Sequence, residues 1–330
     1  MQMQAGKRKN LVVLVLAFAA VYIIWGSTYL AIKYAIETMP TFLMAGVRFI
    51  IAGSMLYTWA RLSPSYERPK REHWRTSVIV GALLLGVGNG GVVLAEHYIS
   101  SGLAALLVAT VPFWIVLLGW MFMGKGRPNW KVTTGLLLGF VGVYLLIAGR
   151  NSEAGGNNQF WGVIIILVST LGWAIGSLYG SKAPTAPSTV LAAGMQMLSG
   201  GIILLLIGTI SGEWSGFDLR TVSANSWCAF IYLITLGAFV AYTAYSWLLK
   251  NASPSSLSTY AYVNPAIAVV LGWAVAGETL TGRMLIGAAI IVGSVALISL
   301  QKRSKAPVIE ESGEDELTTV ASQGRPRYST

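Results

Sequence analysis

Four polar side chains in an otherwise apolar stretch of sequence could bind a small molecule or move a proton: Arg48, Asn89, Glu96 and His97. A guanidinium group binds carboxylates through its planar fork of N–H donors. A histidine titrates near neutral pH, and a carboxylate inside a membrane commonly serves binding or proton transfer. Asn89 lies two helical turns before Glu96 and would share its face of a helix. These residues predict a site for a small anion or carboxylate, with proton coupling as a further expectation.

Each of these side chains also has a purely structural interpretation. A charge such as Arg48 costs about 2.5–3.5 kcal/mol inside a membrane unless it faces protein or water, so it should point inward, where it could simply tie two helices together. A pairing of Glu96 with Lys33 or Arg48 belongs to the functional interpretation, as part of a proton-linked gate, although Lys33 lies near the end of its segment and is expected to snorkel. Glu96 and His97 could instead form an interfacial pair wetted by the outer solution. The sequence leaves these alternatives open.

Aromatic residues and prolines supply the rest of the expected site. Most of the 12 Trp and 14 Tyr residues should lie in interfacial belts. A smaller set could stack on an aromatic or cationic substrate: Trp25, Tyr29, Trp173 and Tyr260.

Asn264-Pro265 and Pro112 occupy matching places in two apolar segments, where proline removes a backbone hydrogen bond. Helix breaks at matching positions point to a transporter's binding site and gate, whereas kinks that only shape a helix bundle are the alternative.

Several other chemistries are not expected from this chain. Gly86 to Gly91 satisfies the dinucleotide pattern G-x-G-x-x-G, but it lies inside an apolar segment rather than after a strand. No H-E-x-x-H and no P-loop motif is present, and His73 and His97 lie in different segments. The single cysteine, Cys228, excludes an intramolecular disulfide. We therefore expect no catalytic residue, no metal site and no cofactor.

The elements that must position these residues are membrane helices. Hydrophobic residues make up 55% of the chain, charged residues only 11%, and the mean hydropathy is +0.64. Runs of about 20 apolar residues are long enough to cross about 30 Å of hydrocarbon as helices. The pattern predicts an all-α integral membrane protein with ten transmembrane helices, near residues 11–36, 41–60, 76–98, 100–122, 130–149, 159–180, 189–211, 224–248, 253–277 and 282–300.

The distribution of positive charge predicts the topology. If the N-terminus is cytoplasmic, the outer loops hold only Arg150, Arg220 and Arg283, while the other loop and tail lysines and arginines lie inside. Both termini are therefore expected in the cytoplasm, with the tail 301–330 disordered. The net charge of +10 follows from this topology, so no nucleic-acid partner is expected.

An internal repeat divides the chain into two halves. Ser100-Ser101-Gly102 leads to Pro112 and Gly119-Trp120, and Ser253-Pro254-Ser255 leads to Pro265 and Gly272-Trp273 at the same spacing. Each half holds five expected helices, so the second half should enter the membrane from the opposite side. The expected organisation is a cytoplasmic N-terminus at 1–10, inverted five-helix repeats at 11–149 and 150–300, and the tail at 301–330.

A series of short motifs links this chain to a known family. They are Ile24-Trp25-Gly26-Ser27-Thr28-Tyr29, Ala45-Gly46-Val47-Arg48-Phe49, Gly88-Asn89-Gly90-Gly91, Ala95-Glu96-His97, Ala109-Thr110-Val111-Pro112 and Tyr260-Ala261-Tyr262-Val263-Asn264-Pro265. In order and spacing the chain resembles the EamA-type, ten-helix branch of the drug/metabolite transporter superfamily over about residues 11–300. The resemblance implies a bacterial inner-membrane exporter of amino acids, in some members aromatic ones, and of other small metabolites.

The expected function is thus secondary export of small metabolites, amino acids among them, by alternating access across the lipid bilayer of the inner membrane. The main alternative is an exporter of small drugs or organic cations, for which Glu96 would supply the carboxylate. A membrane receptor or scaffold that binds without transport and an intramembrane enzyme are the non-transport alternatives. The sequence leaves the oligomeric state and the substrate open.

Overall fold

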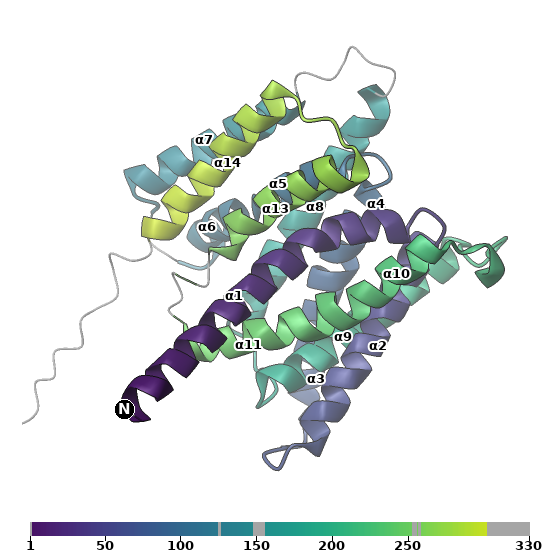
Figure 1. Cartoon of the computed structure of the whole chain (residues 1–330), viewed down its shortest axis with the longest axis vertical. Coiled ribbons are helices and arrows are strands. Elements are labelled where there is room, and N and C mark those ends of the chain that lie inside the picture. The colour runs from purple at the N-terminus through teal and green to yellow at the C-terminus, as the bar shows by residue number, and fades with distance from the viewer. Residues whose placement is uncertain (1, 125–126, 148–155, 253–255, 257–258, 302–330) are drawn as a thin grey trace, which may run out of the picture.

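The computed structural model describes residues 2–124, 127–147, 156–252, 256 and 259–301, which are helices and short connections without strands (Figure 1). The expected tail 301–330 lies outside this range except for its first residue. The elements are α1 (Gln2–Ala35), α2 (Thr41–Leu62), α3 (Arg71–Gly81), η1 (Ala82–Asn89), α4 (Gly90–Ala95), α5 (Ser101–Val108), α6 (Val111–Phe122), α7 (Trp130–Ile147), α8 (Gly156–Gly180), α9 (Thr189–Ile210), η2 (Leu219–Thr221), α10 (Ala224–Tyr232), η3 (Leu233–Val240), α11 (Ala241–Asn251), α13 (Tyr260–Ala276) and α14 (Gly282–Gln301).

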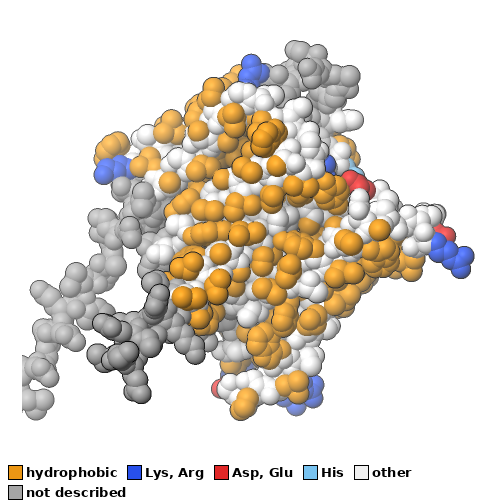
Figure 2. Space-filling view, viewed as in Figure 1, with side chains coloured by type: hydrophobic (Ala, Val, Ile, Leu, Met, Phe, Trp, Pro, Cys, Tyr) orange, Lys and Arg blue, Asp and Glu red, His pale blue; other side chains and the backbone are white. Residues whose placement is uncertain are grey.

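These elements combine into the ten membrane helices expected from the sequence. Seven helical segments are long and apolar enough to cross a membrane, and three shorter apolar helices complete the set at Trp130–Leu146, Tyr260–Ala276 and Gly282–Ile298. Hydrophobic side chains cover the middle of the face seen in Figure 2, and Lys and Arg side chains lie mainly toward its edges. This surface suits a bilayer, because apolar side chains meet lipid while charged ones reach water.

Two of the membrane helices change their winding at matching places in the repeats. The third consists of α3, η1 and α4, and the eighth of α10, η3 and α11; both η1 and η3 are π-helical. A π-helical turn widens the helix and often lies at a functional site. Gly86 in η1 and Gly237 in η3 occupy the same place within the two segments.

Helices α2 and α9 cross through pairs of glycines that relate the repeats to each other. A side-chain carbon at Gly46 would lie 2.9 Å from the carbonyl oxygen of Gly201, and one at Gly53 would lie 3.0 Å from that of Gly194. In the repeat, Ala45-Gly46 corresponds to Ala193-Gly194, and at the same spacing Gly53 corresponds to Gly201. Gly46 therefore meets the counterpart of Gly53, and Gly53 meets the counterpart of Gly46. This reciprocal pairing is what an inverted repeat requires, and glycine lets the two backbones approach closely.

A second pair, α7 and α14, packs at the edge of the bundle, at the upper left of Figure 1. A side-chain carbon at Gly142 would lie 3.2 Å from the carbonyl oxygen of Gly287, so these helices also meet through small residues. In each pair, a helix of the first repeat packs against its counterpart in the second repeat. The bundle is therefore assembled across the repeat boundary rather than as two separate halves.

The described connections between helices lie at two opposite faces of the bundle. We call one the Glu278 face; it contains the connections 36–40, 96–100, 211–223 and 277–281, which are joined by polar contacts. We call the other the Arg61 face; it contains the connections 63–70 and 181–188, near a small core of Ala60, Ala186 and Leu191. A pathway through the bundle would join these two faces.

Candidate functional site

Arg48 and Asn89 form the core of the site between α2 and η1. Arg48 lies two residues after the Gly46 crossing and is only 3% exposed. Its Nη2 donates a 2.6 Å hydrogen bond to Oδ1 of Asn89, and its guanidinium lies 4.4 Å from the centre of the Phe49 ring. Its Nε is buried and has no hydrogen-bond partner among the described residues. A buried donor without a partner is costly, so this nitrogen is available for a ligand acceptor.

Glu96 follows α4 directly and is the second charged group of the site. Its carboxylate is 6% exposed, and within the described part of the chain neither oxygen has a hydrogen-bond partner. Burial raises the pKa of the Glu96 carboxyl well above its ordinary value, and the nearby charge of Glu278 raises it further, against Lys33 and Arg48. Neither of the two pairings considered for Glu96 is formed among the described contacts, because Asn89 binds Arg48 and Glu278 binds Lys33.

His97 points to a different place from its neighbour Glu96. Its Nε2 lies 2.7 Å from Oγ1 of Thr41, the first residue of α2, on the Glu278 face. Burial lowers the pKa of His97, and the carboxylate of Glu213 partly opposes this shift. The sequence grouped His97 with Glu96 because the two are adjacent, but the turn after α4 separates their side chains. His97 therefore belongs to the contacts between connections on the Glu278 face, and no described contact joins it to Arg48.

Asn264 is a candidate site residue from the second repeat. It lies in α13, is 8% exposed, and its Oδ1 is buried without a partner in the described structure. Pro265 follows inside the helix and supplies no N–H, so the carbonyl of Ala261 loses its helical donor. A side-chain carbon at Gly26 would lie 3.2 Å from the carbonyl oxygen of Asn264, which brings α1 directly against this stretch.

An aromatic cluster, which we define as Trp25, Tyr245 and Tyr260, lies where α1, α11 and α13 meet. The Trp25 ring centre is 5.1 Å from that of Tyr245 and 5.6 Å from that of Tyr260, and the two tyrosine rings are 5.9 Å apart. The Trp25 Nε1 donates to the carbonyl of Gly237 in η3. Tyr29, one turn beyond Trp25, interacts electrostatically with both Glu96 and Tyr260. Tyr29 therefore connects the aromatic cluster to the charged groups.

Two of the expected residues lie elsewhere. Trp173 packs from α8 against Gly88, where a side-chain carbon would be 2.9 Å from its ring, so it supports η1 from outside the aromatic cluster. Pro112 is in the first turn of α6, directly after the break that separates α5 from α6 at Thr110. Both residues shape elements that carry the site. Neither has a described contact with Arg48 or Glu96.

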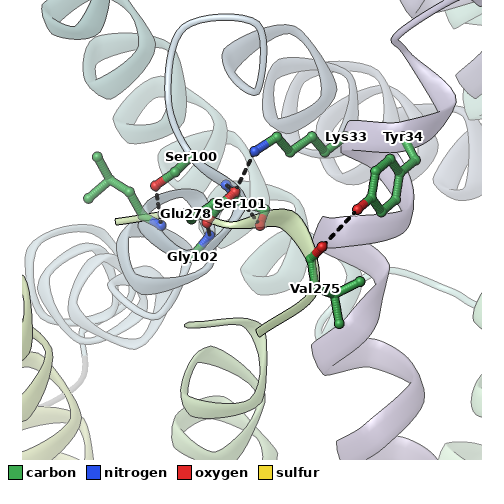
Figure 3. Close-up of polar contacts among 8 residues, drawn as sticks. Lys33, Tyr34, Ser100, Ser101, Gly102, Val275 and Glu278 are labelled. Carbon is green, nitrogen blue, oxygen red and sulfur yellow. Dashed lines mark hydrogen bonds and ion pairs between the residues drawn. The ribbon is translucent and has the colours of Figure 1, made fainter. Parts of the chain in front are cut away.

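The structure adds a polar node that sequence reasoning did not single out (Figure 3). Oε1 of Glu278 lies 2.8 Å from Nζ of Lys33 and accepts from the backbone N–H and the hydroxyl of Ser101, both at 2.9 Å. Oε2 accepts from the N–H of Gly102 at 3.2 Å. Burial alone would raise the pKa of Glu278, but these hydrogen bonds outweigh it and hold the pKa below its ordinary value. The carboxylate is therefore ionised at neutral pH.

A second carboxylate repeats this arrangement. Glu213, which follows α9, accepts from the N–H groups of Phe42 and Leu43 at the start of α2 at about 3.0 and 2.9 Å. Negative charge at a helix N-terminus is stabilising, because the first N–H groups have no helical acceptor. The clue in the sequence was an acidic residue soon after each of two membrane helices. The sequence does not show which N-terminus such a residue would reach.

The fold and the site define a class of protein. The chain is a ten-helix membrane protein built from an inverted repeat, with buried, partly unsatisfied charged groups where the two repeats meet. Membrane proteins that enclose such groups at the interface of inverted repeats are typically secondary transporters. The described residues contain no group of three His, Cys, Asp or Glu side chains suited to a metal ion.

Comparison with known proteins identifies the family. The EamA-like transporter family matches residues 12–148 and again 160–300, so the chain belongs to that family and is a membrane transporter. It is 38% identical to the "Uncharacterized inner membrane transporter YedA" of Escherichia coli, over 91% of this chain and 96% of that protein. It is 27% identical to the "Uncharacterized transporter YvbV" of Bacillus subtilis, over 90% and 94%. A crystal structure with 19% sequence identity matches 88% of this chain and 98% of its own with a TM-score of 0.59, which shows the shared fold.

Proposed function

We propose that this protein exports small metabolites, amino acids among them, across the inner membrane by alternating access. In this proposal both termini lie in the cytoplasm, so the Glu278 face is periplasmic and the Arg61 face cytoplasmic. The repeats span about residues 11–149 and 150–300. The relative from Escherichia coli is named as an inner membrane transporter, which supports this location.

The observation that carries the proposal is the set of buried polar atoms that have no hydrogen-bond partner in the described part of the chain. Nε of Arg48 is a charged donor, and the oxygens of Glu96 and Asn264 are acceptors. The charges of Arg48 and Glu96 act on each other, so both groups belong to one electrostatic environment. An amino acid complements this set, because its carboxylate can bind Arg48 while its ammonium group binds Glu96.

The aromatic cluster supports a preference within that class. Trp25, Tyr245 and Tyr260 offer three ring surfaces on one side of Tyr29. Aromatic pairs contribute about 0.5–1.5 kcal/mol beyond the area they bury. Amino acids with aromatic side chains are therefore the substrates that this arrangement favours. The same rings and Glu96 would also suit an organic cation, which is the second candidate.

Flux through purified protein in liposomes tests the proposal. The panel should contain neutral and aromatic amino acids, carboxylates without an ammonium group, and quaternary ammonium cations. Loss of a hydrogen bond to a charged group costs about 1.5–3 kcal/mol, so Arg48→Met should raise KM for amino acids about 10- to 150-fold. Arg220→Met, at an exposed arginine outside the site, is the matched control and should behave as wild type.

The outcomes separate the candidates. Amino-acid flux that is lost in Arg48→Met but kept in Arg220→Met supports the proposal, provided that both variants unfold at similar temperatures. Flux of quaternary ammonium ions alone, unaffected by Arg48→Met, would favour the organic-cation exporter. No flux of any compound in either gradient direction would contradict the proposed function.

Energy coupling is a separate part of the proposal. Glu96 is the protonatable group that we propose exchanges a proton for substrate. The charged and titratable groups that act on it come from several elements: Lys33 and Tyr29 of α1, Arg48 of α2, and Glu278 after α13. A cationic substrate group approaching Glu96 would favour release of its proton, because the two positive charges compete for one carboxylate.

A further inference from the structure

We infer that the ion pair between Lys33 and Glu278 is a latch that holds the Glu278 face closed and must break each time that face opens. The inference rests on the proposed alternating access. The pair joins Lys33, near the end of α1 in the first repeat, to the connection between α13 and α14 in the second. It therefore crosses the boundary between the repeats on this face, and both of its charges act on Glu96.

The latch has a fixed side and a releasable side. Glu278 is 6% exposed and is held on α5 by the N–H groups of Ser101 and Gly102 and by the Ser101 hydroxyl. Lys33 is 31% exposed, and its described contact to the carboxylate is a single hydrogen bond. Breaking the pair costs little free energy on the lysine side, because the Lys33 ammonium group already reaches water. Separation is thus expected between Lys33 and Glu278, while Glu278 stays on α5.

A second contact lies on the same seam. The hydroxyl of Tyr34 donates to the carbonyl of Val275 at 3.4 Å, one residue along α1 from Lys33 and near the end of α13 (Figure 3). Both contacts join α1 to the end of α13 or to the connection that follows it. Moving the end of α1 away from α13 would break them together.

The repeat indicates that the latch is specific to this face. By the spacing that relates Pro112 to Pro265, Glu278 corresponds to Lys125 and Ser101 corresponds to Pro254. A lysine cannot accept a hydrogen bond from a helix N-terminus, and a proline has no N–H to donate. An inverted repeat would place an equivalent latch at the opposite face, but the residue types there cannot form it. This sequence difference favours states that are closed at the Glu278 face.

Cysteine labelling tests the latch without requiring a substrate. Cys228→Ser removes the native thiol, and Tyr29→Cys places a reporter one helical turn below Lys33 on α1. A membrane-impermeant maleimide is added to intact cells and, separately, to inverted membrane vesicles. In this background Lys33→Met and Glu278→Gln should raise the labelling rate from the Glu278 face about two- to fivefold, since each breaks the ion pair.

Two variants serve as controls. Lys33→Arg keeps the charge and should label like the parent. Ser101→Ala removes one hydrogen bond to Glu278 but leaves Lys33 paired, so it should change the rate less than Lys33→Met. Unchanged labelling in both Lys33→Met and Glu278→Gln, with elution and thermal midpoint like the parent, would overturn the latch. An equal rise in Ser101→Ala would also overturn it, because the ion pair would not be the determining contact.

The result can be distinguished from failure of the proposed function. Faster labelling in a protein that moves none of the compounds in the flux panel would support the latch and contradict the substrate proposal. Normal amino-acid flux in the protein that keeps Tyr29, together with a labelling rate that does not change in Lys33→Met or Glu278→Gln, would do the reverse. Faster labelling only from inverted vesicles would support the latch and contradict the proposed orientation of the termini.

Discussion

Replacement of Gly46 by alanine tests the contact that positions Arg48. The added methyl carbon would lie 2.8 Å from the backbone nitrogen of Leu205 and 2.9 Å from the carbonyl oxygen of Gly201, where ordinary contacts are 3.4–4 Å. Backbone atoms cannot rotate away as a side chain can, so α2 and α9 must move apart. Overpacking of this kind costs about 1–3 kcal/mol. Alanine recovers up to about 1 kcal/mol through its higher helix propensity.

Gly293→Ala is the matched control. Gly293 lies inside α14, and nothing lies within 4 Å of the position of its added carbon. This variant gains the same propensity without the clash, so the propensity terms cancel between the two proteins. The free energy of unfolding of Gly46→Ala should therefore be lower than that of Gly293→Ala by about 1–3 kcal/mol. The measurement is reversible unfolding in mixed micelles, followed by tryptophan fluorescence.

Gly201→Ala provides an internal check, because its added carbon would lie 2.9 Å from the carbonyl oxygen of Gly46. It should destabilise the protein by a similar amount. The double variant should cost less than the two single effects added together, since helices that one methyl group has separated accommodate the second more easily. Equal stability of Gly46→Ala and Gly293→Ala would refute the close crossing. Full additivity in the double variant would show that the two glycines do not share one contact.

Two further predictions concern the site. Glu96→Gln should keep downhill flux at a raised KM, because the uncharged amide binds the substrate ammonium group more weakly, but it should lose the response to a pH gradient. In wild type that response can reach at most about tenfold per pH unit for one titrating group. A response that survives in Glu96→Gln would exclude this carboxylate as the proton carrier. Because the pKa of Glu278 is held low, Glu278 stays ionised above its ordinary value of about 4.3 and is protonated only at lower pH, so the latch should not contribute to that response. Tyr245→Ala should weaken binding of aromatic amino acids about 2- to 13-fold relative to aliphatic ones, and Tyr245→Phe, which keeps the ring, should not. The measurement is competition for flux. Equal losses for both substrate classes would contradict ring stacking.

The sequence predicted the scaffold better than the contacts. Ten helices and their duplication follow from apolar length and repeated spacing, both of which are local or periodic properties. Arg48 and Asn89 were recognised separately, but their hydrogen bond depends on how far α2 and η1 are rotated. Glu278 was not recognised, because a carboxylate in a connection normally meets water. Only the approach of the α5 N-terminus and Lys33 converts it into a buried, paired group.

Tyr245 was missed for a related reason. In a chain with 14 tyrosines the usual place for one near a helix end is the membrane interface, and nothing in the spacing separates Tyr245 from the others. Its ring meets Trp25 and Tyr260 because α11 follows the π-helical η3, which shifts the register of the residues beyond it. His97 shows the opposite case, since adjacency to Glu96 suggested a shared role that the turn after α4 prevents.

The duplication explains the scaffold but not the chemistry. Glycine crossings and π-helical segments occur in both repeats, whereas the charged groups occur once. Their counterparts in the second repeat are Gln196 for Arg48, Val240 for Asn89 and Trp247 for Glu96. Two symmetric binding sites would need a second guanidinium and a second carboxylate at these places. The site that we propose is therefore single and off the repeat axis, with its charged groups from the first repeat and with Asn264 and the Tyr245–Tyr260 ring pair from the second.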